Sequence, residues 1–195
     1  MYAYNPNRKG IAEVQILKLE THRLYPPKDQ LNDEFLRRPK PEGFRIDRDT
    51  PIASIGSCFA REIKFWLREN DYNYLQLATG PCTEAGSARY DRVYNTFSIR
   101  QEVERAFGLF NPICTHWRFE EDGKERWLDP HRHCVAWEDQ ADMDHELQEH
   151  NIAVHRAFTE AKVIIITVGQ GEIWYDKRDN SVFPMAPPTK VFDRD

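Results

Sequence analysis

Two short runs of apolar residues, each followed or closed by glycine, place the tightest constraint on the fold of this chain. Residues Thr50–Gly56 read TPIASIG, and residues Lys162–Val168 read KVIIITV and are followed by Gly169. Short β-branched runs are typical of buried strands, and the second run predicts a strand that is buried on both faces. Stretches with helical spacing lie between the two runs, so the sequence predicts an α/β fold with a parallel sheet flanked by helices.

Three stretches with the residue spacing of helices accompany these strands. Residues 60–70 follow the first strand, and residues 98–107 are followed by Gly108, a residue type that commonly ends helices. Residues 142–161 precede the second strand and carry an apolar stripe formed by Met143, Leu147, His150, Val154 and Phe158. Elsewhere we expect a strand at residues 72–78, a loop at residues 80–90 and irregular structure at residues 111–138.

The first 48 residues differ in character from the rest of the chain. Residues 25–43 contain four prolines among many charged residues and show no apolar periodicity. This composition predicts an extended arm or linker over residues 1–48, with a short strand at residues 12–19. One domain is expected to follow over residues 49–195.

The composition argues against several classes of protein. The formal net charge is −5, so no basic excess is available to neutralise the phosphates of a nucleic acid. The longest apolar run, Val163–Val168, is too short to cross a membrane, and charged residues near the start replace the apolar stretch of a secretory signal. Four widely spaced cysteines are not typical of a disulfide framework, which favours reduced thiols and a cytoplasmic location.

The loops that follow the two strands carry the candidate functional residues. Ligands of parallel sheets bind at the edge where the strands' carboxyl ends meet, so we expect Gly56-Ser57-Cys58 to lie near Gly169-Gln170-Gly171-Glu172. Ser57 or Cys58 would then occupy a sharp turn at a helix N-terminus, where free N–H groups stabilise an oxyanion or a thiolate. The simpler interpretation makes Ser57 a helix cap and Cys58 a small buried side chain.

A series of short motifs resembles those of the GSCFA family. The first, Ile55-Gly56-Ser57-Cys58-Phe59-Ala60, spells the signature that gives the family its name. The others, in order, are Ser87-Ala88-Arg89-Tyr90, Tyr94-Asn95 with Arg100-Gln101, Asp129-Pro130, residues 150–156, Thr167-Val168-Gly169 and Glu172-Ile173-Trp174. The resemblance covers residues 49–195. The family in turn resembles the SGNH/GDSL hydrolases, flavodoxin-like α/β enzymes that cleave or transfer acyl esters through a Ser-His-Asp arrangement.

This resemblance implies an ester hydrolase or O-acyltransferase that acts on an acylated polar metabolite or carbohydrate and needs no cofactor. Placing the hydrolase motif on Gly56 puts Cys58 at the nucleophile position, and a shift of one residue puts Ser57 there. The residues implied around the oxyanion and the substrate are Gly56, Asn95, His150, Gly169, Gln170, Gly171 and Glu172.

The sequence also departs from the hydrolase pattern. Gly171 stands where the hydrolases carry an oxyanion-hole asparagine, and Asp91 replaces a glycine that usually follows Arg89-Tyr90. The last histidine is His155, so no late Asp-x-x-His motif is present. We therefore expect the chain to be the N-terminal part of a longer protein whose general base lies outside it. The alternative is a non-catalytic ligand-binding module that keeps the cleft without the chemistry.

Other polar residues have simpler interpretations. Five possible zinc ligands match no common zinc-binding spacing, so no metal site is predicted; they are Cys114, His116, His131, His133 and Cys134. His150 lies on an apolar stripe and is most simply a hydrogen-bonded residue facing the core. Glu172 would either orient a base or bind substrate, or else pair with an arginine.

Overall fold

The computed structural model describes residues 43, 45–83, 85–90, 92–169 and 171–191. The chain divides into two compact units, Met1–Arg45 and Ile46–Asp195, and the described helices and strands belong to the second unit. Most of the predicted N-terminal arm lies outside the described residues, as does the strand predicted at residues 12–19.

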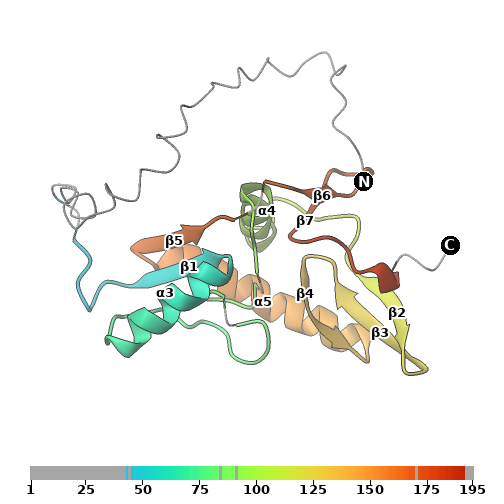
Figure 1. Cartoon of the computed structure of the whole chain (residues 1–195), viewed down its shortest axis with the longest axis horizontal. Coiled ribbons are helices and arrows are strands. Elements are labelled where there is room, and N and C mark those ends of the chain that lie inside the picture. Colours follow the sequence, from blue (N-terminus) through green and yellow to red (C-terminus); the bar gives the residue numbers. More distant parts are fainter. Residues whose placement is uncertain (1–42, 44, 84, 91, 170, 192–195) are drawn as a thin grey trace, which may run out of the picture. The chain divides into compact units, whose positions relative to one another are not determined.

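A parallel pair of strands forms the first sheet (Figure 1). β1 (Ile52–Gly56) pairs with β5 (Val163–Thr167) in a register that places Ile52 opposite Val163 and Gly56 opposite Thr167. Both predicted strands are confirmed. Their carboxyl ends lie side by side, as the candidate site requires.

Three helices accompany this sheet, and each begins directly after a polar capping residue. They are α3 (Cys58–Glu69), α4 (Thr96–Ala106) and α5 (Gln140–Glu160). The side chains of the preceding Ser57, Asn95 and Asp139 accept hydrogen bonds from backbone N–H groups of the first turn, which satisfies donors that have no partner within the helix. The three predicted helices are confirmed, and each starts about two residues earlier than its apolar pattern.

Helices cover both faces of β1. Side chains alternate along a strand, so Ile52 and Ile55 point to opposite faces. Ile52 belongs to an apolar cluster with Leu67 of α3, whereas Ile55 belongs to a cluster with Ala153 and Val154 of α5. The prediction of an α/β fold with a parallel sheet flanked by helices is therefore confirmed.

The second strand is less buried than its composition predicts. Side chains of β5 are mostly half-buried, and Ile166 is 51% exposed. Ile166 lies opposite Ile55, on the face that α5 covers over β1. In the described part of the chain β5 pairs with β1 alone, so burial of β5 on both faces is a wrong prediction.

The strand predicted at residues 72–78 is reduced to a single bridge. Tyr74 forms a parallel bridge with Ile52, after which this edge of β1 takes other partners. Ser87 exchanges two hydrogen bonds with the Ser54 backbone, and the Val93 N–H donates to the carbonyl of Gly56 over 2.9 Å. Loop residues therefore form the hydrogen bonds with the backbone of β1 that a full strand at residues 72–78 would otherwise form on this edge.

Residues predicted as irregular form an antiparallel sheet instead. Its strands are β2 (Trp117–Glu121), β3 (Lys124–Asp129) and β4 (Arg132–Trp137), in the order β2-β3-β4. Asp122 and Gly123 form the first turn with φ angles of 54° and 73°, the pair of positive values that a tight hairpin requires. An Asp-Gly pair is a strong hairpin signal, and the high charge of the flanking residues obscured it.

Two small elements complete the described chain. β6 (Trp174–Tyr175) and β7 (Val182–Phe183) form a short antiparallel hairpin. The 3-10 helix η2 (Thr189–Val191) contacts β2.

A buried chain of ion pairs joins α5 to the antiparallel sheet. Arg132 bonds Asp129 over 2.8 Å and Glu146 of α5 over 3.0 Å, and Glu146 also pairs with Arg89. Asp129 and Arg132 are almost completely buried, so each of these charges depends on its partner for the stabilisation that water would otherwise provide.

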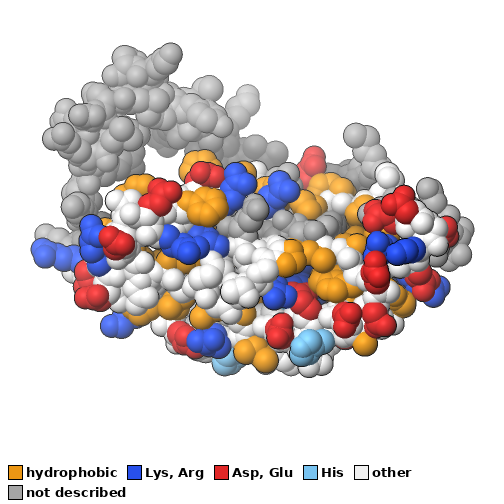
Figure 2. Space-filling view, turned by 90° about the horizontal axis from the view of Figure 1, so that it is seen from below, with side chains coloured by type: hydrophobic (Ala, Val, Ile, Leu, Met, Phe, Trp, Pro, Cys, Tyr) orange, Lys and Arg blue, Asp and Glu red, His pale blue; other side chains and the backbone are white. Residues whose placement is uncertain are grey.

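The described surface gives two further observations. None of the described helices is long and apolar enough to cross a membrane. On the face shown in Figure 2, acidic and basic side chains are interspersed rather than gathered by sign.

Candidate functional site

The site begins at a close approach between the ends of β1 and β5. Gly56 has a φ of 153°, and a Cβ there would lie 2.3 Å from the carbonyl oxygen of Thr167. No real side chain tolerates that distance, so only glycine allows the two strand ends to come together here. This approach aligns the loop after β1 with the loop after β5.

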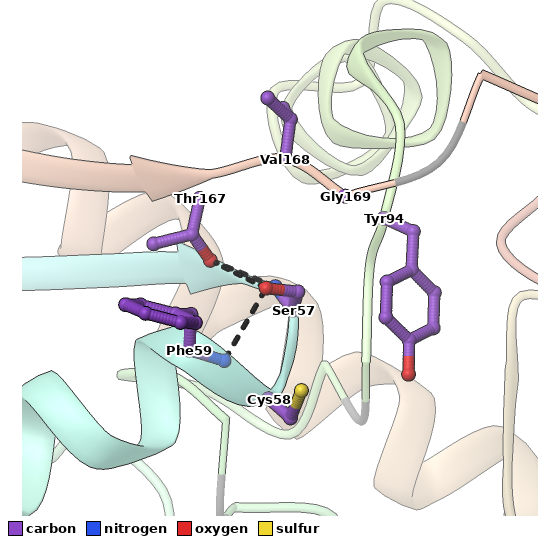
Figure 3. A pocket seen from close by; sticks show the side chains of 7 residues that line it. All are labelled: Ser57, Cys58, Phe59, Tyr94, Thr167, Val168 and Gly169. Atoms are coloured by element: carbon purple, nitrogen blue, oxygen red, sulfur yellow. Dashed lines mark hydrogen bonds between the residues drawn. The ribbon is translucent and has the colours of Figure 1, made fainter. Parts of the chain in front are cut away.

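Ser57 is held in place by several hydrogen bonds and is almost completely buried. Its N–H donates to the Thr167 hydroxyl over 2.9 Å and to the Thr167 carbonyl over 3.3 Å. Its own hydroxyl shares a 3.1 Å hydrogen bond with the Thr167 hydroxyl and accepts the N–H of Phe59 over 3.3 Å (Figure 3). Ser57 is therefore a helix cap that also fastens α3 to the end of β5.

Cys58 is the first residue of α3 and differs from Ser57 in its exposure to solvent and in its hydrogen bonding. It is an exposed free thiol, and its sulfur lies apart from the hydrogen-bonded group around Ser57 (Figure 3). N–H groups in the first helical turn have no acceptor within the helix, and the helix dipole favours negative charge at this end. The position suits a thiolate or an oxyanion formed beside it.

An open pocket of about 510 Å³ surrounds this thiol. Its lining residues come from both strand ends and from the segment before α4; they are Ser57, Cys58, Phe59, Tyr94, Thr167, Val168 and Gly169. The Gly169 N–H donates to the carbonyl of Tyr94 over 2.9 Å, which fixes the loop after β5 against that segment. The convergence of the two loops at the carboxyl edge, which the sequence predicts, is present in the structure.

Two further predicted residues of the second loop, Gly171 and Glu172, are not among the residues that line the described pocket. Gly171 and Glu172 are exposed, and a Cβ at Gly171 would meet no atom within 4 Å. Gln170 lies outside the described residues. A role for these three residues stays a prediction.

Asn95 is the N-cap of helix α4. Its side-chain oxygen accepts the N–H of Ser98 over 2.8 Å as the cap of α4. Its side-chain nitrogen is buried without a hydrogen-bond partner among the described residues, and Asn95 does not line the pocket, although its neighbour Tyr94 does.

His150 lies in the core and not at the pocket. Its Nε2 is 2.8 Å from Glu102, and its ring meets that of Tyr90 edge-on. Burial lowers the pKa of His150. Burial would raise the pKa of Glu102, but Arg105 and His150 outweigh that effect and bring it to about 2. A neutral imidazole that donates to a carboxylate is the resulting arrangement, in line with the simpler interpretation of His150.

The cysteines and histidines of the loop region do not form a described metal centre. His131 is buried against Gln101 and the carbonyl of Val182, and burial lowers its pKa to about 4. Among the side chains that the structure describes, no three His, Cys, Asp or Glu residues are placed to hold a metal, and those of His133 and Cys134 lie outside that description.

One expectation about the thiols is wrong. Cys58 and Cys114 are free, but Cys82 is disulfide-bonded. The cytoplasmic location, which rested partly on reduced thiols, stays a prediction.

The sequence analysis missed the residues that shape the pocket. Thr167 and Val168 belong to the predicted second strand and to a motif, and Phe59 and Tyr94 belong to other motifs, but no sequence pattern assigns any of the four to the lining of a pocket. Each lies within or next to one of the motifs, so their position beside the two strand ends was the available signal.

The model of the GSCFA family matches residues 51–195, which include both strand ends and the whole pocket lining. The chain belongs to the GSCFA family. Neither the curated proteins nor the solved structures include a match to this GSCFA chain.

Proposed function

We propose that this GSCFA protein is an ester hydrolase or O-acyltransferase in which Cys58 is the nucleophile. The observation that carries the proposal is the contrast at the start of α3, where Ser57 is buried and hydrogen-bonded while Cys58 is exposed, free and inside the pocket. The acyl donor would be an acylated polar metabolite or carbohydrate.

The reaction needs few parts. The Cys58 thiolate attacks the acyl carbonyl, the ester C–O bond breaks, and the departing alkoxide takes a proton from water. The resulting thioester is then attacked by water or by an acceptor alcohol, which releases the acyl product and restores the thiol. Cysteine is intrinsically a strong nucleophile, so attack can begin without an adjacent base. The N-terminus of α3 stabilises the developing oxyanion.

A non-catalytic binding module is the second candidate. It is favoured by the absence of imidazole and carboxylate groups among the described pocket residues and by the burial of His150 against Glu102. Such a module would keep the pocket and its exposed thiol but would not turn over an ester.

The test is turnover of p-nitrophenyl acetate, with mass spectrometry to locate the acyl group. The proposal expects multiple turnovers per chain, a thioester on Cys58, and a loss of about a hundredfold or more in kcat for Cys58→Ala. Cys114→Ala removes the other described free thiol and is the matched control, expected to act as the unmodified protein. A single acylation without turnover, even with glycerol present as an acceptor alcohol, would overturn the hydrolase and the acyltransferase and favour the binding module.

A further inference from the structure

Two large apolar side chains are exposed among the residues that line the pocket, which also include the hydroxyl groups of Ser57, Tyr94 and Thr167. Phe59 is 69% exposed and Val168 is 58% exposed, and these residues follow the two strand ends on either side of the Ser57–Thr167 hydrogen bonds (Figure 3). Large exposed apolar side chains that line a pocket are typical of a surface that binds an apolar group.

The backbone that carries these two side chains is held in place. The N–H of Phe59 donates to the Ser57 hydroxyl, which fixes the first turn of α3. Val168 lies between Thr167, which bonds to Ser57, and Gly169, which bonds to Tyr94. A ligand that binds here therefore orders side chains but not the backbone, which limits the entropic cost of binding.

No charged side chain lies among the described residues that line the pocket. A carboxylate or ammonium group that binds here would lose part of its water without gaining an opposite charge from these residues, which is unfavourable. The N-terminus of α3 favours an anion, and it lies at the thiol itself, where the oxyanion would form.

From these walls we infer that the group bound beside Cys58 is an uncharged apolar acyl chain, aliphatic or aromatic, with Phe59 and Val168 as specificity-determining residues. That the apolar group is an acyl chain rests on the proposed function. The polar part of the substrate would then lie outside the apolar walls. A pocket of about 510 Å³ is within the size range of small-molecule sites, so the chain can be several carbons long.

The first experiment measures binding without requiring turnover. Methanethiosulfonate reagents that carry a benzyl, a sulfonatoethyl or a trimethylammonioethyl group each form a mixed disulfide with Cys58 and release methanesulfinate. Rates at the Cys58 peptide are followed by mass spectrometry and divided by the rates with 2-mercaptoethanol. We expect the benzyl reagent to exceed both charged reagents by about tenfold, including the anionic one that the helix dipole attracts.

Matched variants of α3 identify the wall. Phe59→Ala is expected to lower the normalised benzyl rate about fivefold and to leave the charged reagents unchanged. Phe65→Ala is the control, because Phe65 is a partly exposed phenylalanine of the same helix that does not line the pocket. Equal rates for benzyl and charged reagents, or equal effects of the two variants, would overturn the inference.

The second experiment separates this inference from the proposed function. If p-nitrophenyl esters are hydrolysed, kcat/KM should rise about threefold for each methylene from acetate to hexanoate. Hydrolysis without any preference for longer chains would overturn the apolar specificity and leave the hydrolase standing. Apolar labelling preference without hydrolysis would support the apolar pocket and overturn the hydrolase.

Discussion

Replacement of Gly56 by alanine tests the close approach on which the site depends. The new Cβ would lie 2.3 Å from both the carbonyl oxygen and the hydroxyl of Thr167, and 2.8 Å from its backbone nitrogen. Overpacking of this kind costs about 1–3 kcal/mol, and a φ of 153° adds about 1–3 kcal/mol for a residue with a side chain. We expect the free energy of unfolding to fall by about 4 kcal/mol.

Urea unfolding followed by circular dichroism measures this loss. With a slope of about 2 kcal/mol/M, the midpoint of Gly56→Ala should lie about 2 M below that of the unmodified protein. Gly108→Ala is the matched control for backbone strain, because Gly108 has a φ of 69° and a Cβ there would meet no atom within 4 Å. That control should lose only about 1 kcal/mol.

Two results would refute the reasoning. One is a Gly56→Ala protein whose stability lies within about 1 kcal/mol of Gly108→Ala, since the contact with Thr167 would then cost nothing. The other is full rescue of Gly56→Ala by Thr167→Ala. That second change removes the hydroxyl and leaves the backbone carbonyl, so rescue would mean that the backbone is no obstacle.

Three further predictions follow from buried or capping residues. Glu102 has a pKa of about 2 against an ordinary 4.5, so its contribution to stability is complete above about pH 4.5 and is lost as the pH falls towards 2. The free energy of unfolding, measured as a function of pH, should fall over this range. Glu102→Gln should flatten that part of the curve. His131, with a pKa of about 4, should keep a neutral ring in the folded protein at pH 5.5, and an imidazolium signal in nitrogen NMR spectra would contradict its burial. Ser57→Ala should cost about 1 kcal/mol of stability as a lost cap while Cys58 still reacts with iodoacetamide; loss of that reactivity would argue that Ser57 does more than cap.

Much of the fold could be predicted from the sequence because its main elements carry local signals. β1 and β5 are short β-branched runs next to glycine, and α5 has an apolar stripe at helical spacing. The antiparallel sheet was missed because most residues of β2 and β3 are charged, so neither strand carries the apolar run that reveals β1 and β5. The Asp122-Gly123 turn carried the hairpin signal that those charges obscured.

The sequence predicts where the candidate site lies more accurately than it predicts which residues form it. Parallel pairing of two strands is enough to bring Gly56-Ser57-Cys58 beside Thr167-Val168-Gly169. The choice between Ser57 and Cys58 is not local, because it depends on a hydroxyl 110 positions away in Thr167. The partner of His150 is also remote in the sequence, since Glu102 lies 48 positions away on another helix and no spacing rule connects them.

The buried ion pairs around Arg132 restrict how the sequence of this protein can change over time. Removing one member of a buried pair costs about 3–5 kcal/mol, whereas replacing the whole set by apolar side chains of similar volume can cost nothing. Arg132 forms ion pairs with both Asp129 and Glu146, and Glu146 forms a second ion pair with Arg89. Descendants that lose one of these charges should therefore have lost its partner as well. Single substitutions will be rare here, and coordinated replacements are the route by which this part of the core can drift.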